Sequence, residues 1–475
     1  MGRKKSTKPL LLFGFIPFVL LLTTLTAHAA GGEEDAGHGL DPTVLLGLGV
    51  FLVLAKLAGE AFERLGQPAV LGELLSGIAL GSLVLFGFTG AEALRTNEVL
   101  AAIAEIGVIV LLFEVGLESN LGEMLEVGAS SLLVAILGVV APFFLGWGVG
   151  AYFLPDAATL VHVFIGATLC ATSVGITARV LKDAGKLQTR ESRIVLGAAV
   201  IDDVLGLLLL AIVAGAIRAQ AAGGALSAAD VGLIAAKSIG FLVVAIALGH
   251  FVVPHLFRGA GRMESRGVLL GLSIAFCFLL AWAAALVGLA PIIGAFAAGL
   301  VLDEAHFESF IQRGERDLND LIAPVSALLV PTFFVLMGLK VDLRVFSRPE
   351  ILSFAAVLTL AAIAGKQLCS LGVLERGVNR TAVGLGMIPR GEVGLIFAGI
   401  GATLRLPNAQ GVSEPVIDAA TFGAIVIMVV VTTFITPPAL KWSLARSAAP
   451  PTPRINANKL RVSEAAEEAA ERTTR

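Results

Sequence analysis

Two adjacent aspartates, Asp202 and Asp203, lie inside the otherwise apolar run VIDDVLGLLLLAIVAGAI. They come about ten residues into a predicted helix over 193–217, which places them near its middle at about 1.5 Å of rise per residue. A carboxylate at the centre of a bilayer costs at least about 2.5 kcal/mol. The flanking apolar runs provide no helix start that either residue could cap. We therefore expect the pair to have a function.

The chemistry that suits two buried carboxylates is reversible binding of small cations. Hard carboxylate oxygens bind monovalent cations, and the same oxygens bind protons. Burial and mutual repulsion both favour the protonated form, and the two groups titrate as one coupled unit. A site that holds a cation or protons, but not both at full occupancy, is the minimum requirement for cation/proton exchange.

A third charge, Lys366, stands mid-way along AAVLTLAAIAGKQLCSLGVL, in a helix predicted over 351–373. An ammonium at this depth needs a partner, and a carboxylate of the Asp202–Asp203 pair is the obvious candidate. The alternative is that the flexible lysine side chain reaches the membrane interface.

Two predicted helices are interrupted by small, polar or helix-breaking residues. The first contains GATLCATSVGIT, and the second contains GLGMIPRGEVGLIFAGIG, with Arg390 and Glu392 beside Pro389 and Gly391. Interrupted helices at comparable places in two halves indicate inverted repeats around a site at the membrane midplane. Ordinary packing through small residues is the alternative. Arg390 and Glu392 could simply pair with each other or with neighbouring helix ends.

The composition supports a membrane class. Of 475 residues, 56% are hydrophobic and 15% charged, against about 25% charged in soluble proteins, and the mean hydropathy is +0.90. The formal net charge of -3 gives no sign of nucleic-acid binding, and three isolated cysteines suggest neither disulfides nor a metal site. No P-loop or dinucleotide fingerprint is found. We expect no cofactor, and transport driven by an ion gradient.

A bilayer span needs about 20 predominantly apolar residues. Segments of this kind fall at 43–61, 69–88, 98–117, 129–154, 159–180, 193–217, 230–257, 266–287, 289–303, 320–340, 351–373, 381–403 and 416–439. We therefore predict an all-α polytopic membrane protein with about thirteen transmembrane helices, in contact with membrane lipid.

The two ends of the chain differ from this pattern. The start has a basic region, an apolar core and small residues at Ala27 and Ala29, which predicts a cleaved signal peptide over 1–29; an uncleaved anchor helix is the alternative. An extracytoplasmic N-terminus over 30–42 would follow. The transmembrane domain is expected over 43–440 and a polar cytoplasmic tail over 441–475.

Positive charges gather on one predicted side of the membrane. They are Arg179, Lys182, Lys186, Arg190 and Arg193 in one loop, Arg258, Arg262 and Arg266 in another, and Lys441, Arg446, Arg454, Lys459 and Arg461 in the tail. The opposite loops are poorer, except for Lys340, Arg344 and Arg348. Because basic loops favour the cytoplasm, we expect the N-terminus outside and the C-terminus inside.

Five stretches resemble the monovalent cation:proton antiporter-2 family, which includes Kef-type and NapA-type transporters. They are RLGQPAVLGELLSGIALG, AEIGVIVLLFEVGLESNL, LAPIIGAFAAGLVL, PTFFVLMGLKVDL and the long block from GATLCATSVGIT to VIDDVLGLLLLAI. The resemblance covers about 42–440 and implies a bacterial inner-membrane homodimer. It also implies two broken helices that cross and a core domain that moves against a dimerisation domain. The nucleotide-binding domain of Kef-type proteins is not in this sequence, so ligand gating of that kind is not expected.

The adjacent aspartates resemble those of NapA-type sodium/proton antiporters. The resemblance implies that Asp203 is the principal carboxylate for the transported Na⁺ and for protons. It also implies that Asp202 forms an ion pair with Lys366, in the matching context AGKQL. Whether Lys366 carries a proton or only stabilises the empty site stays open.

The same resemblance assigns residues at the two interrupted helices. Thr172 and Ser173, in ATSVGIT, would lie beside the ion where the broken helices cross. Glu392 matches a membrane-embedded acid of the twelfth helix, and Arg390 is its charged neighbour. We regard these two as accessory charges.

We conclude from the sequence that the chain is a secondary active transporter and not an enzyme. The predicted activity is electrogenic exchange of Na⁺ (or Li⁺) for protons by alternating access. A K⁺/proton antiporter of the same fold is the first alternative, because selectivity depends on cavity size and ligand field. An intramembrane aspartyl protease and a channel are the alternatives from other classes. A protease needs two aspartates facing each other across a substrate, normally from separate helices.

Overall fold

The structure is a computed structural model that describes residues 41–86, 90–119, 128–222, 227–261, 263, 265, 267–302, 310, 316–407 and 412–446. The predicted signal peptide, all but the end of the predicted extracytoplasmic N-terminus, and most of the predicted tail lie outside the described residues. So do Arg262 and Arg266 of one basic loop.

Within the described residues, nine helices are long and apolar enough to cross a membrane. They are α2 (Pro42–Arg64), α5 (Glu98–Glu118), α7 (Ala129–Phe153), α10 (Arg190–Ala221), α11 (Ala228–Phe251), α13 (Val268–Leu286), α16 (Leu318–Leu339), α17 (Pro349–Leu368) and α20 (Ala419–Arg446). Shorter apolar helices are α3 (Ala69–Ser82), α8 (Thr159–Thr168), α14 (Pro291–Val301) and α19 (Glu392–Thr403). Each segment predicted to span overlaps one of these helices, and the prediction of a mainly helical membrane protein is confirmed, whereas the count of about thirteen spans stays a prediction.

The remaining elements are short. They are α4 (Gly90–Thr96), α9 (Val174–Asp183), α12 (Val253–Ala260), α18 (Arg380–Gly386), the 3-10 turns η1 (Leu83–Phe86), η3 (Leu343–Ser347) and η4 (Cys369–Gly372), and the strands β1 (Arg405–Pro407) and β2 (Ser413–Pro415). The strands form one antiparallel pair, which the all-α prediction did not include. The helix predicted over 230–257 is two helices, because Pro254 has no N–H to continue the ladder of α11.

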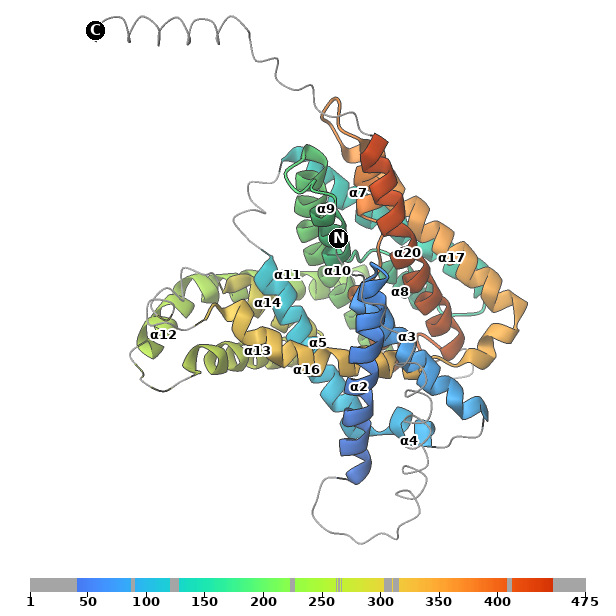
Figure 1. The fold of residues 1–475 in the computed structure, drawn as a ribbon, viewed down its shortest axis with the longest axis horizontal. Coiled ribbons are helices and arrows are strands. Elements are labelled where there is room, and N and C mark those ends of the chain that lie inside the picture. Colours follow the sequence, from blue (N-terminus) through green and yellow to red (C-terminus); the bar gives the residue numbers. More distant parts are fainter. Residues whose placement is uncertain are drawn as a thin grey trace, which may run out of the picture.

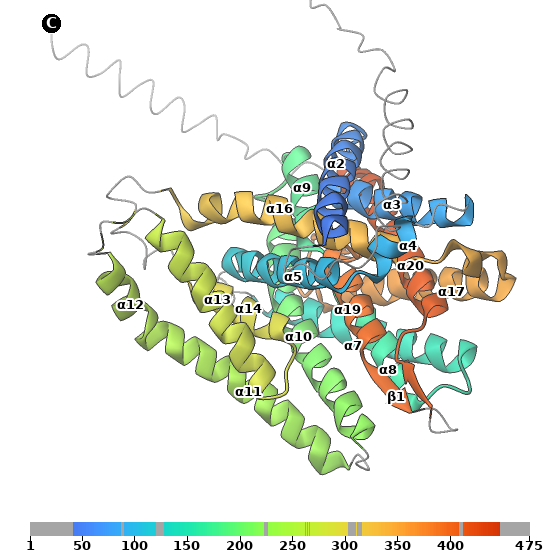
Figure 2. The same cartoon turned by 90° about the horizontal axis from the view of Figure 1, so that it is seen from below.

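The helices pack as two bundles (Figures 1 and 2). The first bundle contains α2, α3, α5, α13, α14 and α16, and the second contains α7 to α10 and α17 to α20. Helix α11 packs against both α10 and α14, and η3 leads directly from α16 to α17. The two aspartates and the lysine therefore belong to the second bundle.

Glycines let the helices of the first bundle approach closely. A Cβ on Gly77 of α3 would lie 2.1 Å from the Val335 carbonyl oxygen of α16. A Cβ on Gly116 of α5 would lie 2.3 Å from the Phe296 carbonyl oxygen of α14. Because lipid does not drive apolar helices together, backbone contact of this kind is a main source of packing energy in membranes.

Candidate functional site

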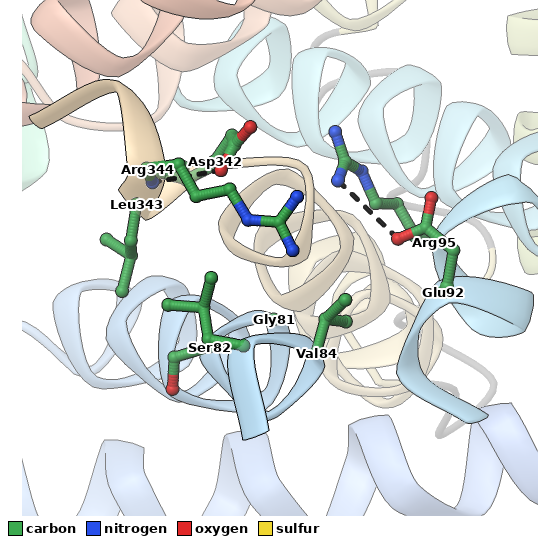
Figure 3. Close-up of a pocket in the computed structure, with 10 residues that line it drawn as sticks. Gly81, Ser82, Val84, Glu92, Arg95, Asp342, Leu343 and Arg344 are labelled. Carbon is green, nitrogen blue, oxygen red and sulfur yellow. Dashed lines mark hydrogen bonds and ion pairs between the residues drawn. The ribbon is translucent and has the colours of Figure 1, made fainter. Parts of the chain in front are cut away.

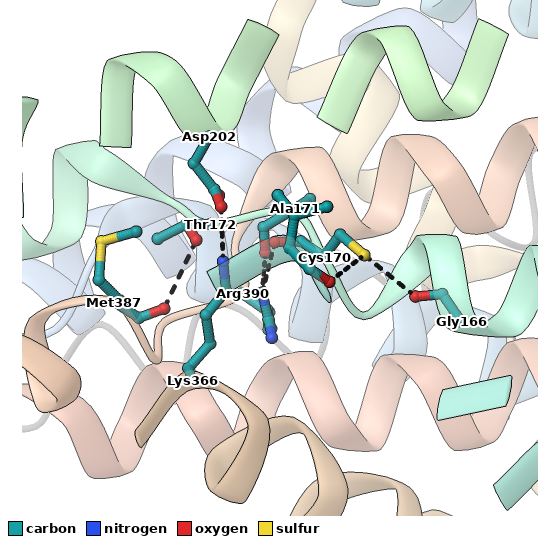
Figure 4. Close-up of polar contacts among 9 residues, drawn as sticks. Gly166, Cys170, Ala171, Thr172, Asp202, Lys366, Met387 and Arg390 are labelled. Atoms are coloured by element: carbon teal, nitrogen blue, oxygen red, sulfur yellow. Dashed lines mark hydrogen bonds and ion pairs between the residues drawn. The ribbon is translucent and has the colours of Figure 1, made fainter. Parts of the chain in front are cut away.

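Lys366 and Asp202 form an ion pair in the interior of the second bundle (Figure 4). Lys366 Nζ donates a hydrogen bond to Asp202 Oδ1 over 2.8 Å, and both side chains are 0% exposed. The alternative that Lys366 reaches the membrane interface is therefore wrong: its ammonium has a carboxylate partner inside the bundle. The second carboxylate oxygen, Asp202 Oδ2, is buried and has no hydrogen-bond partner among the described residues.

A glycine of α7 makes room for this ion pair. A Cβ at Gly138 would lie 3.4 Å from Lys366 Nζ and 3.5 Å from Asp202 Oδ1. Gly138 was not among the residues predicted to matter. Its spacing could have indicated it, because a small residue or proline recurs every fourth position on one buried face of α7: Gly138, Pro142, Gly146 and Gly150.

Asp203 is buried in the same helix but has no such partner. Its side chain is buried, and the described residues provide neither a hydrogen bond nor an ion pair to its carboxylate. The charged side chains that act on it electrostatically are Asp202, Glu392, Lys366 and Glu118, three of them acidic. Helix α10 continues unbroken through both aspartates, so their side chains point about 100° apart and meet different neighbours. One carboxylate of the pair is thus neutralised and the other is free.

The two interruptions expected from the sequence are present, and the chain segments that form them touch. Residues 169–173 separate α8 from α9, and residues 387–391 separate α18 from α19. The Ser173 N–H donates to the Pro389 carbonyl over 2.8 Å, and Thr177 Oγ1 donates to the Gly386 carbonyl over 2.6 Å. Residues more than two hundred positions apart therefore satisfy each other's free backbone groups, as irregular backbone at membrane depth requires.

Arg390 pairs with backbone carbonyls and not with Glu392. Its Nη1 donates to the carbonyl oxygens of Cys170 (3.0 Å) and Ala171, just past the C-terminus of α8 (Figure 4). Of the two alternatives considered above, pairing with a neighbouring helix end is the one observed. The carbonyl end of a helix carries partial negative charge, which a guanidinium offsets. The side chain is fully buried, and its Nε and Nη2 have no partner among the described residues.

Glu392 is the first residue of α19, and its carboxylate accepts hydrogen bonds from Ser173 Oγ at 3.0 and 2.9 Å. Thr172 Oγ1 lies 3.5 Å from the Met387 carbonyl oxygen, at the limit of a hydrogen bond. Glu392 also lines a cavity of about 30 Å³, together with Leu71 and Leu74 of α3 and Thr433 of α20. The acid therefore faces the boundary between the two bundles.

The structure thus divides the residues expected at the site into two contact groups. Asp202 and Lys366 form one group with Asp203 adjacent in the chain, and Thr172, Ser173, Arg390 and Glu392 form the other at the touching interruptions. Asp202 and Arg390 interact electrostatically, which links the groups. The buried Asp203 carboxylate, which has no hydrogen bond or ion pair among the described residues, is the acid of these groups that remains open to a positive ligand.

Gly391 is expected to be required for the contact between the interruptions. A Cβ there would lie 2.7 Å from Ser173 Oγ and 2.9 Å from Ser173 Cβ. We expect Gly391→Ala to displace Ser173 and to destabilise the protein by about 1–3 kcal/mol, as overpacking does. The measurement is the melting temperature of the purified protein. Gly175→Ala is the matched control, because a Cβ at Gly175 meets nothing within 4 Å. Equal melting temperatures for the two variants would contradict this expectation.

The chain is similar to known ion transporters over most of its length. The family described as "Sodium/hydrogen exchanger, transmembrane" matches residues 49–446. The high-affinity Na⁺/H⁺ antiporter NhaS3 of Synechocystis sp. is 39% identical over 90% of this chain and 95% of its own. The Na⁺/H⁺-K⁺ antiporter GerN of Bacillus cereus is 35% identical over 83% and 95%. The solved structure of the sodium proton antiporter MjNhaP1 from Methanocaldococcus jannaschii is similar in fold, with a TM-score of 0.67. The match includes 85% of this chain and 98% of the MjNhaP1 chain. At 16% sequence identity it supports the fold alone.

Proposed function

The chain belongs to the sodium/hydrogen exchanger family, and we propose that it is a sodium/proton antiporter in which Na⁺ and protons compete for Asp203. The observation that carries this proposal is the unequal state of the two aspartates. Asp202 is held by Lys366 at 2.8 Å, whereas Asp203 is buried without a hydrogen-bond or ion-pair partner among the described residues. A single free buried carboxylate needs a positive ligand, and Na⁺ and a proton each supply one charge.

Neutralisation of Asp203 explains how exchange is coupled. With Na⁺ or a proton bound, the carboxylate has no net charge. The loaded site can then close on one side of the membrane and open on the other. The empty carboxylate is charged, and its passage through a water-free barrier is costly. The site therefore changes sides only when loaded, which is the condition for exchange without leak. Movement of the second bundle against the first would provide the alternating access.

The touching interruptions supply the remaining ligands in this proposal. The Thr172 and Ser173 hydroxyls would complete the Na⁺ shell beside Asp203. Arg390 would act as a positioning residue that keeps the C-terminal end of α8 in place, and Glu392 as an accessory acid at the boundary between bundles. The Asp202–Lys366 pair would release a further proton when Na⁺ binds and take one up when Na⁺ leaves, so that more than one proton moves per Na⁺ and the exchange is electrogenic.

The proposal extends to the setting of the protein. We place it in the bacterial inner membrane as a homodimer, with the N-terminus outside and the C-terminus inside. An aspartyl protease does not suit the same geometry. Asp202 is engaged by Lys366, so one free carboxylate remains where that chemistry needs two that share a proton.

The test is exchange in proteoliposomes with a pH-sensitive dye, comparing Na⁺, Li⁺ and K⁺ at equal concentrations. We expect Na⁺ and Li⁺ to collapse an imposed proton gradient and K⁺ to do so much less. An imposed membrane potential should change the rate, because the exchange is proposed to move net charge. Collapse with K⁺ alone would overturn the assignment of Na⁺, and a rate that ignores the potential would overturn electrogenic coupling.

Potassium/proton exchange is the second candidate. GerN is named a Na⁺/H⁺-K⁺ antiporter and is 35% identical to this chain. Carboxylate, hydroxyl and carbonyl oxygens bind either ion, and cavity size and ligand field decide between them. The same ion comparison distinguishes the two candidates.

A further inference from the structure

A second cavity is lined by none of the site residues described above (Figure 3). Its volume is about 200 Å³. It is lined by the end of α3, by η1 and α4, and by residues 341–344, which follow α16 and include the start of η3. The cavity therefore joins the first bundle to the linker that leads into the second bundle.

Two arginines and two acids line this cavity: Arg95, Arg344, Glu92 and Asp342. Arg344 is exposed and projects its guanidinium over the cavity, and that guanidinium has no hydrogen bond or ion pair among the described residues (Figure 3). Arg95 faces it from α4 and has one loose ion pair, at 3.6 Å, with Glu92. The Asp342 Oδ1 atom accepts the Arg344 backbone N–H at 2.9 Å and caps η3, so neither guanidinium is held by a close carboxylate.

A third positive group strengthens this field. Lys340 follows the last residue of the span Leu318–Leu339. Burial, and after it the positive charge of Arg95, lower the pKa of Lys340, and Glu105 partly opposes them. Lys340 does not line the cavity, but its positive charge lies in the same region as Arg95.

The sequence also shows an unusual concentration of positive charge at this place. Lys340, Arg344 and Arg348 are the exception to the charge bias, because they are basic residues on the side that we propose is outside. Positive charge kept at this place needs a reason other than membrane orientation. Guanidinium groups at such a place can hold an anionic group through charge-assisted hydrogen bonds.

We propose that this cavity binds a phosphate group between Arg344 and Arg95. A guanidinium matches phosphate oxygens with two parallel hydrogen bonds, and two facing guanidiniums can hold one phosphate from both sides. The phosphate has two sources, a lipid headgroup at the membrane surface or free inorganic phosphate. The helix ends that surround the cavity are where a headgroup would lie.

A bound phosphate would also restrain the linker between the bundles. Phe346 of η3 packs against α20, since a Cβ on Gly423 would lie 2.9 Å from the Phe346 ring. Arg344, two residues earlier, faces α4 across the cavity, and α4 packs against α2, α3 and α16 of the first bundle. The ligand would thus hold η3 to α4 and slow any movement between the bundles. This consequence rests on the proposed function, whereas the binding does not.

The binding test uses the purified, delipidated full chain in neutral detergent. Melting temperature is measured against inorganic phosphate, short-chain phosphatidylglycerol and, as a phosphate-free lipid, diacylglycerol. We expect stabilisation by a phosphate-bearing probe and an apparent affinity at least about tenfold weaker in Arg344→Gln, because a charge-assisted hydrogen bond pair is lost. Arg95→Gln should show the same loss. Arg348→Gln, an exposed arginine that does not line the cavity, is the matched control and should bind as wild type.

The pattern of probes identifies the source. Stabilisation by inorganic phosphate indicates a free anion site, and stabilisation by phosphatidylglycerol but not by inorganic phosphate indicates a headgroup site. The proposal is overturned when neither probe stabilises the wild type, or when Arg344→Gln responds as strongly as Arg348→Gln. Absence of Na⁺ exchange in the wild type would count against the proposed function and would leave this binding result unaffected.

Discussion

Asp203→Asn is expected to abolish Na⁺-driven proton movement while the protein still folds. The amide has nearly the same shape as the carboxylate but carries no charge and does not take up a proton at working pH. It removes the group for which Na⁺ and protons compete in the proposed mechanism. Because Asp203 has no ion-pair partner among the described residues, its replacement leaves no buried charge unpaired. We expect exchange in proteoliposomes to fall to the level of empty vesicles.

Asp156→Asn is the control for this experiment. Asp156 is an exposed residue between α7 and α8, so the same chemical change there should leave exchange intact. The melting temperature of Asp203→Asn should stay close to that of the wild type or rise, because desolvation of a buried carboxylate is relieved. Na⁺-dependent collapse of the proton gradient that persists in Asp203→Asn would refute the assignment of Asp203.

Lys366→Ala is expected to cause the largest loss of stability among single changes at the site. The ion pair with Asp202 is fully buried, so removal of the lysine leaves an uncompensated carboxylate in the interior. Breaking a buried pair in this way costs about 3–5 kcal/mol. We expect a strongly lowered melting temperature of the purified protein and a much smaller yield of folded protein.

The double variant Lys366→Ala with Asp202→Asn tests the reason for that loss. If the cost comes from the unpaired charge, neutralising Asp202 should restore most of the melting temperature that Lys366→Ala removes. Lys182→Ala, an exposed lysine near the end of α9, should change stability by no more than about 0.5 kcal/mol. A double variant as unstable as Lys366→Ala would show that lost packing, and not the charge, destabilises the protein.

The sequence by itself determined which residues had to matter. A charge at bilayer depth is costly wherever it lies, so the hydropathy of the flanking residues was enough to single out Asp202, Asp203 and Lys366. The second interruption was predictable for a similar local reason, because Pro389 has no N–H to continue a helix. The first interruption, 169–173, contains neither proline nor glycine, and only its small and hydroxyl residues, among them Thr172 and Ser173, indicated it. These inferences need only the chain around each residue.

Only the tertiary structure decided which of these residues meet. Lys366 pairs with Asp202, and Asp203 has no ion-pair partner among the residues that the structure describes. Arg390 bonds to backbone carbonyls of 170–171 and not to Glu392. The phosphate cavity likewise assembles from α3, α4 and residues 341–344, which are far apart in the chain. Partners of this kind depend on how closely and at what rotation the helices pack. That packing is set by many small contacts between backbones, such as those at Gly138 and Gly391, and no local stretch of sequence contains both sides of such a contact.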